Sequence, residues 1–471
     1  MKTIKQFGRR TSLLSIVFVL CAVFLFGCGP KTGDSSGATD GSNASAAGSS
    51  DDYDKYEPQD MGGYEFVIYD CARYGDEHPP RGGTLFDDAV WDVKEKIEED
   101  FKCEISWKYF DPINAYQLIY AEIMSGAKAG DVIVTPTFGI TSFILSDSLM
   151  PWNRLDTINF DSPHWTKEII DCYTLNGNIY AIGSDLRYLG AKVSGLMYNK
   201  DMIINKGFED PYELVKKDQW TYDAFREMAK AAVEDNGDGK MDQYDKYGIG
   251  GPFFNKGFFD ASGAKILQKD ENGKIQFVMD KDPNAMNAIQ WIRDIRYGGD
   301  NIFYNIDITQ WATWYQMFTN GQIMFIGCAT NDVGAGRDGD FERGFVPYPK
   351  GPGATSWSSA IETNANVWAI PITNTDFRKT EIIMKALNYQ SQINKDAWDE
   401  EIYTYYFEGD ENMKEMHQLM MENISFGHEY MVNPAWWLFD TTMFEDRDPQ
   451  QVLEEQQPGI VADLEEKYNT K

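Results

Sequence analysis

Strand-like and helix-like segments alternate from about residue 64 onward, and this order limits the possible folds most. Residues 64–70 and 103–110 have the β-branched and aromatic composition of strands, and residues 85–101 between them place apolar side chains at helical spacing. A second helix is predicted over 115–125, followed by a short buried strand at 132–134. This β-α-β-α-β order predicts a parallel sheet with helices on both faces.

The chain is too long for one hydrophobic core. Its 471 residues exceed the roughly 250–300 that a single core usually serves, so we expect two lobes. A second region begins near Val193, with strands predicted at 194–198, 323–326 and 365–370. Helices are predicted over 221–233, 283–297, 310–319 and 379–392, and the C-terminus reads as mostly helical.

Charge and composition exclude several classes of protein. Lys and Arg number 43 against 74 Asp and Glu, which gives a formal net charge of −31. Such an acidic chain is a poor partner for nucleic acid, whose phosphates need a positive surface. Apolar residues make up 42% of the chain and aromatic residues 14%, which is ample for a packed core and excludes global disorder.

The N-terminus has the features of an export signal. Basic residues at positions 2, 5, 9 and 10 precede a mostly apolar run over 13–27, which ends in Leu25-Phe26-Gly27-Cys28. That ending resembles the bacterial lipobox, in which cleavage exposes a cysteine that receives lipid. We therefore predict a lipoprotein signal peptide over 1–27 and a lipidated Cys28; the alternative is a plain signal peptide with an incidental cysteine.

The segment after Cys28 supports an anchored protein. Gly, Ser, Ala, Thr, Asp and Asn dominate residues 29–52, and such a segment cannot bury enough apolar area to order itself. We assign 28–58 to the lipidated cysteine and a flexible tether. The predicted location is the outer face of a cell membrane of the Gram-positive type, held by the lipid.

Four cysteines remain in the body, and their positions argue against disulfides. Cys71 ends one predicted strand and Cys103 begins the next, so in a parallel pair they lie at opposite ends of the sheet. A disulfide needs the two Cα atoms within about 7 Å. We expect Cys71, Cys103, Cys172 and Cys328 to be free thiols.

The sharpest chemical motif is an acidic loop over 234–245. Set against the twelve-residue calcium loop, oxygen donors fall at positions 1, 3, 5, 9 and 12, a glycine stands at the sharp turn of position 6, and position 7 would donate its carbonyl. The predicted ligands are Glu234, Asn236, Asp238, Lys240, Asp242 and Asp245. We expect this calcium to be structural, because the loop follows a helix; the alternative is a solvated acidic turn.

A ligand cleft is expected at the carboxyl ends of the strands, where α/β sheets bind ligands. Aromatic rings stack on the C–H faces of sugars, and carboxylates and hydroxyls bind sugar hydroxyls. The candidate ligand-binding residues are Asp70, Thr137, Asp185, Phe253, Phe254, Trp357, Trp436 and Trp437. Trp368, in an apolar strand, is instead expected in the core.

Several segments together resemble extracellular solute-binding proteins of family 1, the maltose-binding type. They are Asn-Gly-Asn-Ile-Tyr-Ala-Ile at 176–182, Leu-Met-Tyr-Asn-Lys-Asp at 196–201, Trp-Thr-Tyr-Asp-Ala-Phe at 220–225, Phe-Thr-Asn-Gly-Gln-Ile-Met-Phe at 318–325 and Pro-Tyr-Pro-Lys-Gly-Pro at 347–352. The resemblance covers roughly residues 62–440.

The resemblance implies a two-lobed, type II periplasmic-binding-protein-like α/β fold. Each lobe would hold a mainly parallel sheet flanked by helices, and crossover strands would form the hinge. We place the first lobe at 59–190 with a return segment at 361–425, and the second at 191–360 with C-terminal helices at 426–471. The implied function is capture of a carbohydrate and delivery to the permease subunits of an ABC importer, by a monomer without catalytic activity.

Two rival functions stay open. A secreted glycoside hydrolase would need a pair of carboxylates about 5–10 Å apart across a cleft, and the sequence singles out no such pair. A binding protein for an organic anion would need a basic cluster, and only scattered basic residues are present. A peptide is a further possible solute.

Overall fold

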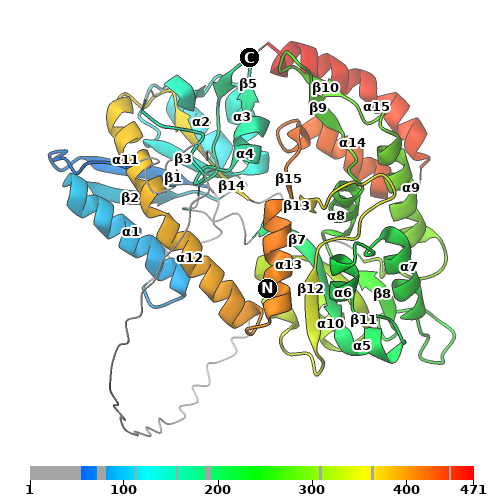
Figure 1. The fold of residues 1–471 in the computed structure, drawn as a ribbon. Helices are drawn as coiled ribbons and strands as arrows, with labels where there is room; N and C mark the ends of the chain where they lie inside the picture. Colours follow the sequence, from blue (N-terminus) through cyan, green and yellow to red (C-terminus); the bar gives the residue numbers. More distant parts are fainter. Residues whose placement is uncertain are drawn as a thin grey trace, which may run out of the picture. The chain divides into compact units, whose positions relative to one another are not determined.

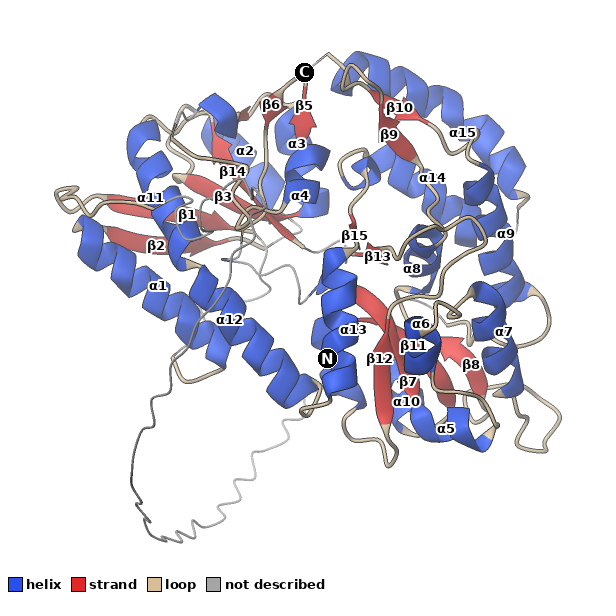
Figure 2. Cartoon of the chain, viewed as in Figure 1, coloured by secondary structure: helices blue, strands red, loops and turns tan. Residues whose placement is uncertain are grey.

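The computed structural model describes residues 55–71, 81–111, 114–154, 157–184, 186, 192–306, 310–361, 365–444 and 447–470. Cys28 and Asp185 lie outside these ranges. Two sheets with flanking helices make up the described fold (Figures 1 and 2). The cysteines at 71, 103, 172 and 328 are free thiols, as expected.

The first sheet has five strands in the order β2-β1-β3-β14-β4. Their bounds are β1 Glu65–Asp70, β2 Glu104–Tyr109, β3 Val132–Pro136, β4 Leu149–Met150 and β14 Asn366–Pro371. As expected, β1 and β2 are parallel, with Phe66 opposite Ile105. β3 is also parallel to β1, whereas β14 is antiparallel to β3 and β4.

The second sheet has four strands in the order β12-β7-β11-β8. They are β7 Ser194–Asn199, β8 Tyr247–Gly250, β11 Ile323–Ala329 and β12 Arg343–Val346. Only β8 and β11 are parallel, which differs from the expected mainly parallel sheet. Short pairs add β5 Thr174–Leu175 with β6 Asn178–Ile179, β9 Leu267–Lys269 with β10 Ile275–Phe277, and β13 Ser359–Ala360 with β15 Ile424–Ser425.

The crossing strands explain the antiparallel pairs. β14 begins at Asn366 opposite Pro136, the last residue of β3, and β7 begins at Ser194 opposite Ala329, the last residue of β11. Each crossing strand thus enters its sheet at the carboxyl end of a neighbouring strand and runs back against it. The crossings consequently lie at the sheet edges where α/β proteins bind ligands.

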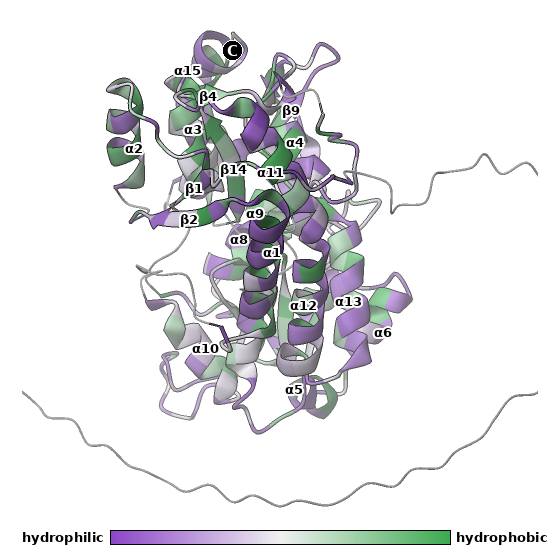
Figure 3. Ribbon diagram, turned by 90° about the vertical axis from the view of Figure 1, so that its left-hand side faces the viewer, coloured by the Kyte–Doolittle hydropathy of each residue, from purple (hydrophilic) through white to green (hydrophobic). Residues whose placement is uncertain are grey.

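The helices follow the sequence pattern closely. Helices α1 Leu85–Phe101 and α7 Tyr222–Ala231 begin after Thr84 and Thr221, whose side chains accept hydrogen bonds from the first turn. Hydrophilic residues dominate the face of α1 seen in Figure 3. Other helices are α2 Ala115–Met124, α3 Thr137–Leu145, α4 Lys167–Cys172, α5 Lys200–Asn205, α6 Pro211–Lys216, α8 Phe254–Ala261, α9 Pro283–Tyr297, α10 Ala312–Thr319, α11 Phe377–Gln390, α12 Gln392–Glu401, α13 Glu411–Glu422, α14 Asn433–Phe444 and α15 Pro449–Asp463.

Successive side chains of β1 point to opposite faces of the first sheet and belong to two different hydrophobic clusters. Phe66 and Ile68 pack with Ile97 of α1, whereas Tyr69 packs with Ile133 in a second cluster that also includes residues of the second sheet. Trp368 is 2% exposed and belongs to the first of these clusters, as expected. Helix α13 lies within the segment assigned to the return to the first lobe, yet it packs against β12 of the second sheet.

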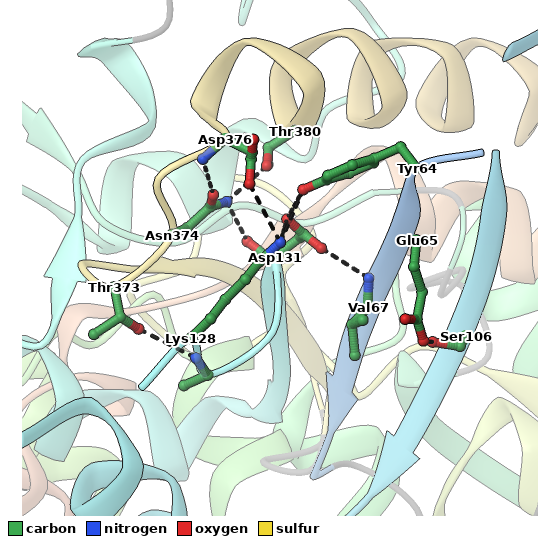
Figure 4. Close-up of polar contacts among 11 residues, drawn as sticks. Tyr64, Glu65, Val67, Ser106, Lys128, Asp131, Thr373, Asn374, Asp376 and Thr380 are labelled. Carbon is green, nitrogen blue, oxygen red and sulfur yellow. Dashed lines mark hydrogen bonds and ion pairs between the residues drawn. The ribbon is translucent and has the colours of Figure 1, made fainter. Parts of the chain in front are cut away.

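A buried polar group fixes the amino end of the first sheet (Figure 4). Asp131 precedes β3 and is fully buried; its carboxylate accepts hydrogen bonds from Tyr64 Oη at 2.5 Å and the Val67 N–H at 2.8 Å, and pairs with Lys128 Nζ at 2.8 Å. Asn374, which precedes α11, donates to the Asp131 carbonyl at 3.0 Å. We call Tyr64, Lys128, Asp131 and Asn374 the Asp131 cluster.

Candidate functional site

A cavity of about 800 Å³ lies at the carboxyl end of β8, and we call it the larger cavity. The loop Gly251–Phe253 after β8, residues 255 and 256 of α8, and residues 360 and 361 at the crossing contribute to its wall. The parallel strand thus directs its loop into the cavity, as expected for an α/β sheet.

Arginine and amide groups form one polar side of the larger cavity. Arg296, near the end of α9, donates to Asn255 Oδ1 at 3.0 Å and Asn305 Oδ1 at 3.1 Å. Its guanidinium carbon lies 4.4 Å from the ring centre of Phe303. Burial lowers the pKa of Arg296. These contacts fix two amide groups in a cavity wall, where amides can exchange hydrogen bonds with ligand hydroxyls.

A second, smaller cavity has a volume of about 320 Å³. Thr137 and Phe138, at the carboxyl end of β3, form one part of its wall, and Trp436 and Trp437 form another. Trp437 is 65% exposed, so its ring is open to a ligand. This cavity is largely aromatic, with Glu429 as its acidic side chain.

Helix α14 supplies an aromatic and acidic side. Trp436 lines both the larger and the smaller cavity, while Asp440, one turn later, lines the larger one. Burial raises the pKa of Asp440 to about 6, although the neighbouring Trp436 indole acts in the opposite direction. A ligand in either cavity would contact the Trp436 ring.

A buried ion cluster joins the walls of the two cavities. Lys256 lines the larger cavity and Glu429 lines the smaller one; Lys256 Nζ lies 3.1 Å from Glu429 Oε1 and also pairs with Asp260. Lys256, Glu429 and Asp260 are 8%, 4% and 3% exposed, respectively. We call Lys256, Asp260 and Glu429 the Lys256 cluster.

The Lys256 cluster holds two carboxyl groups and one ammonium group, and burial affects them differently. Burial alone would lower the pKa of Lys256, but Asp260, Tyr430 and Glu429 together raise it above its ordinary value, so the lysine stays charged. Burial, together with the nearby charge of Glu429, raises the pKa of Asp260 although Lys256 lowers it. Asp260 Oδ2 has no hydrogen-bond partner among the described residues. One buried cation therefore serves two buried carboxylates.

The structure brings four of the expected ligand residues to the cavities. Phe253 lines the larger cavity, Thr137 and Trp437 line the smaller, and Trp436 lines both. Asp70 ends β1, is fully buried and lines neither.

Two of the expected aromatic residues lie elsewhere. Phe254 is fully buried, with its ring 4.8 Å from Phe258 and 4.7 Å from Phe303, because it starts a helix whose residues all face the interior. Trp357 lines neither cavity. Its loop is tied to the start of α7 through Lys350, whose Nζ lies 5.0 Å from the Trp357 ring centre.

Sequence reasoning missed Lys256, Glu429, Arg296 and Asp440. A signal was available for the first two, because Lys256 interrupts the aromatic run 253–259 and Glu429 lies in Phe-Gly-His-Glu-Tyr at 426–430. A charge inside an apolar run is costly to bury unless it is paired. Asp440 carries the same signal, because it directly follows the apolar run 435–439, whereas Arg296 occupies an amphipathic helix and carries no comparable signal.

Loop 234–245 has the expected turn. Gly239 adopts a left-handed φ of +78°, which favours glycine. Its acidic side chains mainly accept from the loop's own backbone: Asp238 from Lys240 at 2.8 Å, and Asp245 from Asn236 at 2.7 Å. Among the described residues, no group of three or more His, Cys, Asp or Glu side chains is placed to hold a metal ion.

Glu234 is engaged in two ion pairs. Its carboxylate pairs with Lys206 at 2.5 Å and Lys246 at 2.8 Å, and these contacts lower the pKa of Glu234 to about 2. In this arrangement Glu234 is turned to the two lysines and would have to leave them to act as a calcium ligand.

Comparisons with known proteins agree with this fold. A family model described as bacterial extracellular solute-binding protein matches residues 93–406. No curated protein sequence matches the chain. No helix in the described ranges has both the length and the apolar character needed to cross a membrane.

Solved structures share the fold at low sequence identity. A cyclic α-maltosyl-1,6-maltose binding protein from Arthrobacter globiformis is 14% identical with a TM-score of 0.59, over 86% of this chain and 99% of that one. The maltose/maltodextrin-binding domain MalE from Bdellovibrio bacteriovorus, bound to maltotriose, is 15% identical with a TM-score of 0.56, over 85% and 100%. An ABC substrate-binding protein from Listeria monocytogenes in complex with cycloalternan is 15% identical with a TM-score of 0.56, over 84% of this chain and 98% of that one.

These structures have the two-lobed substrate-binding fold of the maltose-binding type, and the present chain has it too. The family match covers more than half of the sequence, including the whole second sheet and every strand of the first sheet except β1. The chain belongs to the bacterial extracellular solute-binding protein family.

Proposed function

We propose that this protein binds an oligosaccharide in the two cavities and delivers it to the permease of an ABC importer. The larger cavity, about 800 Å³, carries the proposal: it combines the Trp436 ring with the amides of Asn255 and Asn305, held by Arg296. A few fixed polar groups among aromatic rings suit a sugar, whose hydroxyls need partners and whose C–H faces need rings. The neighbours bound to maltotriose and cycloalternan support a carbohydrate ligand.

Calorimetric titration tests this proposal on the protein lacking residues 1–27. Maltooligosaccharides of increasing length and neutral oligosaccharides of other linkage would be titrated, with short peptides and organic anions as the competing classes. We expect saturable binding by at least one carbohydrate and an increase in melting temperature, because a ligand that binds only the folded state stabilises it. Binding confined to a peptide or anion would contradict the proposal.

The proposed delivery step includes a lipid anchor at Cys28, which keeps the protein at the outer face of the membrane. The lipobox-like Leu25-Phe26-Gly27-Cys28 and the tether after it support this location. Cys28→Ser should prevent lipidation and move the protein from the membrane fraction to the medium. Unchanged membrane association of this variant would contradict the anchor.

Calcium binding by loop 234–245 is a separate proposal, supported by the donor spacing and the Gly239 turn. Binding would require Glu234 to leave Lys206 and Lys246, so we expect modest affinity. Melting temperature would be measured with calcium and with a chelator, for wild type and for the double variant Asp238→Ala, Asp242→Ala. A wild-type melting temperature that does not change with calcium would contradict the site.

A further inference from the structure

We propose that the smaller cavity takes a protonated amine of the ligand, so that the preferred oligosaccharide carries an amino-sugar unit. This inference rests on the proposed function and specifies the ligand class. The observation behind it is a charge deficit: Asp260 and Glu429 are both buried, and among the described residues Lys256 is the one cation that pairs with them.

The surrounding groups do not remove this deficit. His428 lies next to Glu429, and burial together with Lys269 lowers its pKa, which favours the neutral ring. Lys269 pairs with Asp171 at 3.0 Å, so those two charges balance each other. Lys265 is exposed, and its charge lowers the pKa of Asp260 only weakly. A buried carboxylate without a counter-charge is costly, and a ligand cation would supply one.

The lining of the smaller cavity suits a cation. Tyr430 is already occupied, since Lys256 Nζ lies 5.3 Å from its ring centre and Phe426 stacks on it at 4.4 Å. Trp436, Trp437 and Phe138 remain in the wall. Indole faces attract cations more strongly than other aromatic rings do.

The position of the carboxylate favours the same ligand. Glu429 belongs to the cavity wall although the residue is only 4% exposed, so a group that reaches it is itself largely removed from water. In such surroundings an ammonium group gains more from a carboxylate than a neutral hydroxyl does. An amino sugar combines this ammonium with a ring that the two indoles can contact.

Three trisaccharides separate charge from shape: the trimer of glucosamine, the trimer of N-acetylglucosamine, and maltotriose. Titrations at mildly acidic pH keep the amines of the first probe protonated. We expect the glucosamine trimer to bind at least about tenfold more tightly than either neutral probe. Raising the salt concentration should reduce this preference, because it screens the charge.

Glu429→Gln tests the residue while retaining its size. The variant should lose most of the preference for the glucosamine trimer, measured as the ratio of its affinity to that of each neutral trimer. The matched control is Glu401→Gln, a 5% exposed glutamate that lines neither cavity and should leave the preference unchanged. Trp437→Ala changes an exposed ring, should not affect folding, and should weaken binding of the charged probe most.

The possible outcomes are distinct. Equal or tighter binding of the neutral trimers by wild type overturns the inference and leaves the proposed function in place. A preference that survives in both Glu429→Gln and Trp437→Ala also overturns it. Failure of all three trimers and of every longer oligosaccharide to bind contradicts the proposed function as well.

Discussion

Two buried groups of charged residues in this protein differ in how completely their polar atoms are partnered. In the Asp131 cluster, both carboxylate oxygens accept hydrogen bonds, and Lys128 pairs with Asp131 at 2.8 Å and with the more exposed Asp376 at 3.6 Å (Figure 4). In the Lys256 cluster, two carboxylates share one cation, and Asp260 Oδ2 has no partner among the described residues. The first cluster lines neither the larger nor the smaller cavity, whereas the second contributes to the walls of both.

Their places in the sheets explain this difference. Tyr64 and Asp131 precede parallel strands β1 and β3, so the Asp131 cluster lies at the amino edge, where backbone groups need fixed partners. The Lys256 cluster follows β8, at the carboxyl edge. A buried polar cluster whose atoms all have partners within the protein stabilises the fold. A cluster beside a cavity with an unpartnered atom is a candidate for ligand binding.

The largest expected effect is on Lys256→Met, which leaves two buried carboxylates without a cation. Breaking a buried ion pair typically costs about 3–5 kcal/mol of unfolding free energy. Loss of the cation should raise the folded-state pKa of Asp260 further above its unfolded value. Stability is then retained below the unfolded pKa and lost as pH rises, so the deficit should be greatest near neutral pH. Urea unfolding at several pH values measures the loss of unfolding free energy relative to wild type. A loss that does not depend on pH would contradict this interpretation.

Asp131→Asn tests the complete cluster. The amide keeps one acceptor for the Val67 N–H or Tyr64 hydroxyl but loses the ionic hydrogen bonds, which typically contribute about 1.5–3 kcal/mol. Urea unfolding should show this loss, and calorimetry should show unchanged carbohydrate affinity. The control is Asp376→Asn at the more exposed partner of Lys128, with an expected effect below about 1 kcal/mol. A change in affinity larger than the change in stability would break the comparison.

Trp436→Ala removes the ring shared by the two cavities. Loss of an aromatic contact of about 1–3 kcal/mol predicts roughly tenfold to hundredfold weaker carbohydrate binding with the fold intact. Trp311→Ala is the matched control, because that ring is 53% exposed and lines neither cavity. Trp357→Ala should likewise leave affinity unchanged. Calorimetry distinguishes the three, and equal losses in all of them would remove the cavity assignment.

The smallest effect is expected at Asp440. Its folded pKa of about 6 exceeds the ordinary value of about 3.9, so wild-type stability falls as pH rises between these values. Asp440→Asn removes this dependence and should raise the unfolding free energy near neutral pH. Thermal melting at about pH 4 and pH 7 measures the difference. A variant that is less stable than wild type at neutral pH would show that the charged carboxylate is favourably paired.

Local pattern determined much of the secondary structure. The helix over 85–101 was predicted with its bounds, and Thr221 caps its helix as expected, because periodicity and capping depend on neighbours in sequence. The parallel pairing of β1 and β2 also followed from the intervening helix. Sequence did not show that β7 is antiparallel to β11. The direction of β7 depends on where the crossing enters the second sheet, which only tertiary contacts decide.

The site shows the same division between local and distant information. The sequence by itself predicted Trp436, Trp437, Phe253 and Thr137 as ligand residues, from residue type and from the rule that ligands bind at carboxyl edges, and these four line the cavities. It could not separate Phe253, which lines a cavity, from Phe254, which packs on Phe303, because one helical step decides which ring faces inward. Only the tertiary structure placed Lys256 beside Glu429, since whether a charge is buried and what pairs with it depend on segments distant in sequence.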